Sequence, residues 1–276
     1  MSRTTPLYAV ALTAGALVAC SNGTSPAPGG HVTLNASTVP GPAALQSLSS
    51  DPITDGTNTL VFDQVQLVLR DIRFKRVNDD VCEGDTQSGG SNDLVVMSHD
   101  GNGNDGQEDA CESVNAGPSL LDLPLGPGVD KMFSVAIDTG TFDEVRIKLH
   151  KPEDDNGDPA DQAFLTAHPE FAKISIQATG TFNGAPFTFT SDLNAEQRME
   201  LVPPIEVTEA GTTVDVTLKV DLAAWFADGT GGLVDPATAG QGGANENLVR
   251  DNIRDSFHAF RDENHDGEDD HGGGND

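Results

Sequence analysis

Apolar and polar residues alternate over several short segments of this chain. Residues 212–222 are the clearest case, because polar or charged residues separate Val214, Val216, Leu218 and Val220. A period of two puts alternate side chains on opposite faces of a β-strand, so that one face can be buried while the other stays polar. The same signal occurs in residues 64–74, 131–137, 142–150, 174–182, 187–190, 198–202 and 205–208. So many short segments of this kind predict a mainly β protein, an antiparallel β-sandwich over residues 59–226.

Turn residues between the segments predict how the strands follow one another. Asn183-Gly184 is the strongest short signal for a tight hairpin, and it predicts that the strands on either side pair. Gly140 lies in the short connection between residues 131–137 and 142–150, and it predicts a second hairpin. The alternation slips by one residue before Ile72, which predicts a β-bulge near Asp71.

The spacing of apolar residues changes near the C-terminus. Within residues 245–261, one side of a helix would carry Val249, Ile253, Phe257 and Phe260. We therefore expect residues 227–261 to form a loop and an amphipathic helix that docks on the rim of the sandwich. Asp235-Pro236 in that loop is typical of a helix start. Residues 262–276 read as a disordered acidic tail.

The N-terminal segment reads as an export signal. An apolar run follows the single charge of Arg3 and ends in Leu17-Val18-Ala19-Cys20. This ending resembles the lipobox of bacterial lipoproteins, in which the signal is cut before a Cys that becomes acylated. We therefore expect a signal peptide over residues 1–19, lipidation of Cys20, and a membrane contact made through the lipid. Ser21 after the Cys suggests the outer membrane, and residues 20–58 read as a flexible tether with a first strand at 31–37.

The chain is strongly acidic, with 44 Asp and Glu against 15 Lys and Arg and a net charge of −29. Nucleic-acid binding depends on Lys and Arg that neutralise phosphates, so this class of partner is excluded. The charge is compatible with cations, with basic partners, or with solubility alone.

Two further cysteines, Cys82 and Cys111, remain once Cys20 carries lipid. In an oxidising compartment two leftover thiols most simply pair, so we predict a disulfide that closes the acidic, glycine-rich segment between them. A metal site is the less favoured alternative, because no second cysteine pair or neighbouring His completes it.

The sharpest local motif is Asp262-Glu263-Asn264-His265-Asp266-Gly267-Glu268-Asp269-Asp270. It reproduces the first nine positions of an EF-hand-type calcium loop, with Gly267 at the sharp turn. The predicted Ca²⁺ ligands are the side chains of Asp262, Asn264, Asp266 and Asp270 and the backbone carbonyl of Glu268. Gly273 stands where the last, bidentate Glu belongs, so the site would be weak. The alternative is a solvated acidic tail.

Hydrolytic and sugar-binding signatures are missing from the sequence. There is no Gly-x-Ser-x-Gly elbow, no His-Glu-x-x-His and no Lys-bearing phosphate loop, so we do not expect an enzyme. A hydrolase that uses loop carboxylates remains the rival from that class. Sugar sites usually stack on Trp or Tyr, but Tyr8 leaves with the signal and Trp225 is expected to anchor the core.

Four stretches resemble a family of bacterial and archaeal lipoproteins that carry a domain of unknown function. The resemblance covers about residues 59–222 and rests on Val61-Phe62-Asp63-Gln64-Val65, Leu120-Leu121-Asp122-Leu123, Gly140-Thr141-Phe142-Asp143-Glu144-Val145-Arg146-Ile147 and the strand from Val216 to Leu222, which has Asp221 at its end. The resemblance implies a transthyretin-like β-sandwich and an exported address. It carries no catalytic residues.

These expectations combine into one hypothesis about function. The chain is expected to be a membrane-anchored exported lipoprotein that acts as a non-enzymatic binding or scaffold module. A carbohydrate-binding or adhesion sandwich is the alternative. The partner, a protein or a polysaccharide, and the oligomeric state are not specified by the sequence.

Overall fold

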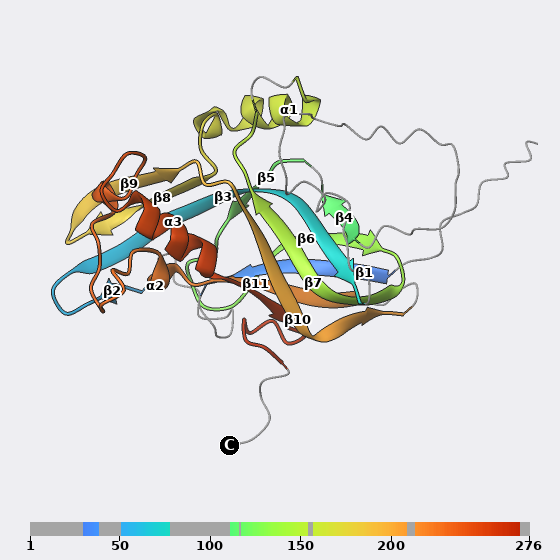
Figure 1. Ribbon diagram of the computed structural model, residues 1–276. Coiled ribbons are helices and arrows are strands. Elements are labelled where there is room, and N and C mark those ends of the chain that lie inside the picture. Colours follow the sequence, from blue (N-terminus) through green and yellow to red (C-terminus); the bar gives the residue numbers. More distant parts are fainter. Residues whose placement is uncertain are drawn as a thin grey trace, which may run out of the picture.

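A computed structural model describes residues 30–38, 51–77, 111–115, 117–153, 157–208 and 213–270, with only the backbone described for 111–115. The protein is mainly β, and its strands form two sheets that face each other in a sandwich-like arrangement (Figure 1). The predicted fold class is therefore confirmed, while the transthyretin-like topology stays a prediction. Among the described residues, no helix is long and apolar enough to cross a membrane.

Twelve strands are described. They are β1 (Gly30–Ser37), β2 (Ile53–Thr54), β3 (Thr59–Arg76), β4 (Cys111–Asn115), β5 (Ser119–Asp122), β6 (Asp130–Ile137), β7 (Gly140–Leu149), β8 (Ile176–Phe182), β9 (Ala185–Ser191), β10 (Ala195–Val207), β11 (Thr213–Val220) and β12 (Phe257–Arg261). The helices are α1 (Pro159–Ala167), α2 (Leu222–Trp225) and α3 (Glu246–Asp255), with 3₁₀ turns η2 (Pro169–Phe171) and η3 (Pro236–Thr238).

The smaller sheet has the order β12-β11-β1-β6, and the larger has the order β10-β7-β3-β8-β9 with β2, β4 and β5 also paired to β3. Pairing is antiparallel throughout except between β1 and β11, which run parallel. The strand predicted at residues 31–37 is confirmed as β1, and it lies inside the smaller sheet. The sheets thus take in β1 and β12, which lie outside residues 59–226.

The long strand β3 organises the larger sheet, because β8 pairs with its first half and β7 with its second half. Asp71 has a left-handed backbone, with φ 49°, and the register shifts between Arg70 and Arg73. The predicted bulge is confirmed. A bulge increases the local twist, which lets one strand serve two differently oriented sets of neighbours.

One predicted hairpin is confirmed and the other is wrong. Asn183 and Gly184 both have positive φ, 53° and 79°, and they join β8 to β9 as a type I′ turn requires. In contrast, β6 and β7 do not pair, because β6 lies against β1 in one sheet and β7 lies between β3 and β10 in the other. The alternation of apolar and polar residues shows which face of a strand is buried, but it does not show which strand pairs with it. A short connection can therefore join two strands of different sheets.

The predicted helix over 245–261 is correct only in its first part. α3 ends at Asp255, and the chain then forms β12, which pairs with β11. Phe257 and Ala259 are buried while His258 between them is exposed, which is a period of two. Pairing with the edge of β11 overrides the helical spacing, because it supplies a hydrogen-bonded ladder and buries Phe257.

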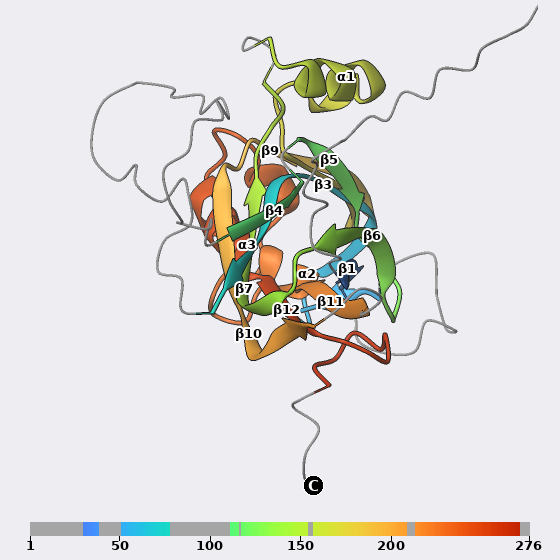
Figure 2. The ribbon, with the colours of Figure 1, turned by 90° about the vertical axis from the view of Figure 1, so that its right-hand side faces the viewer.

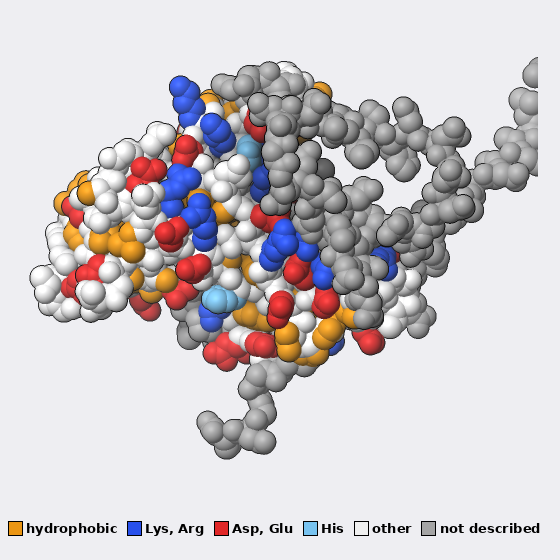
Figure 3. Space-filling model, in the orientation of Figure 1, with side chains coloured by type: hydrophobic (Ala, Val, Ile, Leu, Met, Phe, Trp, Pro, Cys, Tyr) orange, Lys and Arg blue, Asp and Glu red, His pale blue; other side chains and the backbone are white. Residues whose placement is uncertain are grey.

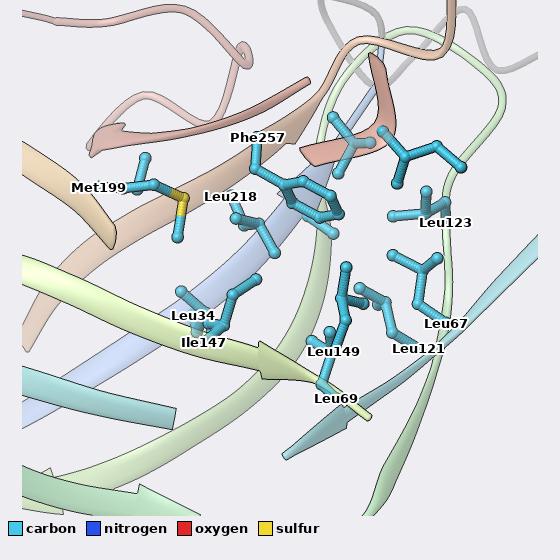
Figure 4. Close-up of a cluster of buried hydrophobic side chains, with 14 of the residues drawn as sticks. Leu34, Leu67, Leu69, Leu121, Leu123, Ile147, Leu149, Met199, Leu218 and Phe257 are labelled. Carbon is cyan, nitrogen blue, oxygen red and sulfur yellow. The ribbon is translucent and has the colours of Figure 1, made fainter. Parts of the chain in front are cut away.

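The core fills the space between the sheets (Figure 4). Leu34 and Leu218 from the smaller sheet point toward Ile147 and Leu149 from the larger one, and all four are at most 1% exposed. Full burial of such a side chain stabilises the fold by about 1.5–3 kcal/mol. Trp225 is fully buried, and its indole N–H donates to Ser256 Oγ at 3.0 Å, so its predicted role as a core anchor is confirmed.

Candidate functional site

The motif at residues 262–270 is a closed loop that continues directly from β12. The backbone N–H of Asp262 donates to the carbonyl of Asp215 on β11 at 3.1 Å, which extends the β11–β12 ladder by one step. The element that enters the loop is therefore a strand and not the helix that the sequence predicted. This start fixes the first predicted ligand at the edge of the smaller sheet.

Asp262 is fully buried, and its carboxylate organises the loop. One oxygen accepts from the N–H of Asp266 at 3.1 Å, and the other accepts from the N–H of Gly267 at 3.0 Å. The second oxygen also accepts from the hydroxyl of Thr217 at 2.8 Å. A buried carboxylate is stable only when such donors replace its lost water.

The remaining polar side chains of the loop repeat this arrangement. Asn264 Oδ1 accepts from the N–H of Asp266 at 2.9 Å, and Asp266 Oδ1 accepts from the N–H of Glu268 at 2.9 Å. Asp270 closes the loop, because its carboxylate accepts from the N–H of Glu263. Gly267 has φ 76°, as the predicted sharp turn requires, and His265 is also left-handed at φ 58°. The described residues 262–270 are therefore an ordered turn and not part of a disordered tail.

The loop lies beside a layer of buried polar side chains on the smaller sheet. Thr217 is fully buried and lies directly opposite Asn35 of β1, which is 2% exposed. Thr33 and Ser37, on the same face of β1, are also buried. The outer face of this sheet thus carries a patch of buried polar side chains on β1 and β11, and Asp262 joins that patch. The alternation in the sequence assigned these polar residues to the outer face of the sheet. It could not show that their side chains are buried there.

Two groups near the loop were missed by the sequence reasoning. Thr217 binds the carboxylate of Asp262, and Asp215 Oδ1 lies 3.4 Å from His265 Nε2. Both residues belong to the polar side of the β11 pattern, which was the one available signal. Arg261 also forms an ion pair with Glu263 at the start of the loop.

In this structure the predicted Ca²⁺ ligands do not surround one common point. Within the described part of the chain, no three His, Cys, Asp or Glu side chains are close enough together to hold a metal ion. Asp262, Asn264 and Asp266 are joined through one turn, whereas Asp270 and Glu268 lie on its exposed side. Gly273 lies outside the described residues. A cation would need Asp266 and Asp270 to exchange backbone partners for metal contacts.

Of the three cysteines, Cys20 and Cys82 lie outside the described residues. Cys111 begins β4, with its backbone opposite Lys75 of β3. Lipidation and the disulfide therefore stay predictions.

One small pocket contains carboxylates of the kind that the rival hydrolase would need. It measures about 310 Å³ and is lined by Lys75, Asp143, Glu144, Glu200, Leu201, Val202 and Pro204. Lys75, Glu144 and Glu200 lie side by side across three strands, and Glu144 forms an ion pair with Arg146. Glu144 and Glu200 are like charges directly opposite each other, and Lys75 and Arg146 beside Glu144 offset their repulsion.

Two other carboxylates are perturbed by their surroundings, and both lie in turns. Hydrogen bonds from Asn58, from the N–H of Thr57 and from the N–H of Leu233 hold the pKa of Asp55 well below its usual range. Donors from Thr230 and Gly232 likewise lower the pKa of Asp228. Both groups are half-buried and accept several hydrogen bonds within their turns, which identifies them as structural carboxylates.

The fold and the loop together define a mainly β, sandwich-like protein whose last strand ends in an Asp/Asn-rich loop. No protein-family model, no curated protein and no solved structure matches this chain.

Proposed function

We propose that this chain is an exported lipoprotein, anchored by lipid on Cys20, that acts as a non-enzymatic binding or scaffold module whose C-terminal loop binds Ca²⁺. The ligands would be the side chains of Asp262, Asn264, Asp266 and Asp270 and the carbonyl of Glu268. The observation that carries the calcium assignment is the buried carboxylate of Asp262, which ties the loop to β11 through Thr217.

The chemistry of the loop suits a hard cation. Carboxylate, amide and carbonyl oxygens at alternate positions are the ligands that Ca²⁺ prefers. Binding would also relieve the repulsion among Asp262, Asp266 and Asp270. With the twelfth ligand missing, we expect a dissociation constant of roughly 10⁻⁴–10⁻³ M, as in extracellular modules.

A binding module fits the rest of the molecule better than an enzyme. The space between the sheets is filled by apolar side chains, and on the face in Figure 3 Asp and Glu are scattered among Lys and Arg. Trp225 is buried, so it is not available as a sugar platform, which weighs against the carbohydrate-binding alternative. The partner, a protein or a polysaccharide, would contact the exposed loops.

The lipid anchor places this module at a membrane, with the outer membrane favoured by Ser21. β1 begins at Gly30, so a lipid on Cys20 would lie ten positions before the first described strand. Growth of cells with a fatty-acid probe should label the protein, and Cys20→Ala should remove the label and release the protein from the membrane fraction. A Cys20→Ala protein that stays with the membranes would contradict the anchor. A Ser21→Ala protein should keep both label and location.

A further inference from the structure

An apolar cavity opens at the edge of the sandwich, where β5 of one sheet approaches β6 of the other. Its volume is about 670 Å³, and it is lined by Leu69, Ile72, Pro118, Ser119, Leu120, Leu121, Met132, Phe133, Ala160, Ala163, Phe164, Ala167 and His168. Leu69 and Ile72 are fully buried core residues, so the floor of the cavity is the sandwich core itself. In both ribbon views α1 stands at this end of the molecule, apart from the two sheets (Figures 1 and 2).

The helix that forms one wall is held firmly in place. Asp161 of α1 is fully buried, and its carboxylate pairs with Arg70 of β3 at 2.9 Å. Phe164 and Phe171 pack with Val68 in a second apolar cluster beneath the helix. Asp158 caps the N-terminus of the helix by accepting from the N–H of Ala160. A wall fixed in this way is preorganised, which lowers the entropic cost of binding a ligand.

The lining has the composition of a site for an apolar molecule with one polar end. Only Ser119 and His168 among the lining residues are polar. The volume lies within the roughly 300–1,000 Å³ typical of small-molecule sites. His168 terminates α1, its ring lies 4.9 Å from that of Phe164, and its Nδ1 lies 3.6 Å from Glu170.

The charges near the open end favour an anionic head. His168 is partly exposed, and Lys173 is exposed just beyond η2. Several Lys, Arg and His side chains lie at the upper end of the face in Figure 3, the end that carries α1. A carboxylate can therefore replace Glu170 as the partner of the His168 ring, while the apolar chain covers Phe133, Met132 and Phe164.

We infer that this cavity binds a single-chain amphiphile with a carboxylate head, of the fatty-acid class. The acyl chain lies between α1 and β6, and the carboxylate accepts a hydrogen bond from the His168 imidazole. This site is separate from the C-terminal loop, and it depends neither on the lipid at Cys20 nor on Ca²⁺.

Titration of the full chain carrying Cys20→Ser with dodecanoate and with dodecanol, both below micelle formation, tests the site and its head group. Cys20→Ser prevents acylation, so that the protein's own lipid cannot compete. We expect saturable binding of both ligands. His168→Ala should weaken dodecanoate by about tenfold, the loss of one charge-assisted hydrogen bond, and leave dodecanol unchanged. Equal weakening of both ligands, or none, would overturn the assigned head group.

Two variants of adjacent residues on α1 test whether the acyl chain of the ligand lies in the cavity. Ala163→Trp fills the cavity and should weaken both ligands by at least about tenfold, because the acyl chain loses its apolar contacts. Gln162 is exposed and is not a lining residue, so Gln162→Trp should bind as the parent chain does. No binding by the parent chain, or unchanged binding by a folded Ala163→Trp, would refute the site.

A covalent readout decides the question even when Ala163→Trp fails to fold. A photoreactive diazirine analogue of dodecanoate should form adducts within residues 118–121, 132–133 or 160–168 of the otherwise unaltered Cys20→Ser chain. Adducts only elsewhere, or none, would overturn the proposal.

Discussion

The hydroxyl of Thr217 donates a hydrogen bond of 2.8 Å to the carboxylate of Asp262, a residue 45 positions later in the chain. Both side chains are fully buried. This contact joins the C-terminal loop to the middle of β11, so that a segment which reads as a tail becomes part of the sheet.

Replacement of Thr217 by Val keeps the shape of the side chain and removes the donor. We expect Thr217→Val to lower the free energy of unfolding by about 1.5–3 kcal/mol, because the buried carboxylate of Asp262 loses one of its hydrogen bonds. Urea denaturation measures the change. Thr213→Val, at an exposed position of the same strand, is the matched control and should shift stability by less than about 0.5 kcal/mol. Equal effects of the two substitutions would argue against the role assigned to the Thr217 hydroxyl.

The buried pair of Arg70 and Asp161 should behave as a unit. Asp161→Asn leaves the Arg70 guanidinium without its closest carboxylate, and we expect a loss of about 3–5 kcal/mol, as for other broken buried pairs. The double variant Arg70→Met, Asp161→Leu should recover much of that loss, because no uncompensated charge remains. Thermal unfolding of Arg70→Met, of Asp161→Leu and of the double variant forms the cycle that measures the coupling. Additive losses would show that the two charges act independently.

The lowered pKa of Asp55 predicts how the stability of the fold changes with pH. The carboxylate is stabilised in the folded state by donors from Asn58, Thr57 and Leu233. Its contribution to stability is therefore full above its unfolded pKa, near 3.9, and is lost as the pH falls through the lower folded value. Asp55→Asn should be less stable than the parent chain at pH 7, and the difference should shrink below about pH 4.

A matched control for Asp55 is Asp51→Asn, since Asp51 is an exposed carboxyl four residues earlier. Denaturant titration between pH 3 and 7 gives the free energy of unfolding as a function of pH. The curve for Asp51→Asn should run parallel to that of the parent chain. A difference between Asp55→Asn and the parent that stays constant over this range would contradict the mechanism.

The predicted disulfide between Cys82 and Cys111 can be tested by mass spectrometry of the alkylated protein. The exported protein should resist alkylation until it is reduced and then take up two alkyl groups. Removal of the bond by Cys111→Ser should cost roughly 3–4 kcal/mol in the chain-entropy view of disulfides. Two thiols that react in the unreduced exported protein would end this prediction.

Much of the fold could be predicted from the sequence, because strands and turns depend on patterns of neighbouring residues. The period of two found most of the described strands, although it missed β2, β4, β5 and β12. Asn183-Gly184 predicted a hairpin, and the phase slip predicted the bulge at Asp71. The partner of each strand could not be found in this way. β6 pairs with β1, which lies about a hundred residues earlier, and nothing in a local pattern encodes that choice.

The site was predicted in the same partial manner. The motif correctly placed a sharp turn at Gly267, where φ is 76°, while the set of Ca²⁺ ligands that it indicates stays a prediction. The entering strand was mistaken for a helix, because Phe257 and Phe260 also fit a helical spacing. The roles of Thr217 and Asp215 depend on tertiary contacts across β11, so no local pattern could have assigned them.

The central claim, that the C-terminal loop binds Ca²⁺ and is coupled to the sandwich, is tested most directly by the thermal midpoint as a function of calcium. With a dissociation constant near 10⁻³ M, 10 mM Ca²⁺ should add about 1.4 kcal/mol and raise the midpoint by roughly 3–6 °C. Asp266→Ala should abolish the rise, whereas Asp269→Ala, a charge change at a non-ligand position of the same loop, should keep it. A midpoint that stays flat up to 10 mM Ca²⁺, or a rise that survives Asp266→Ala, would contradict the claim.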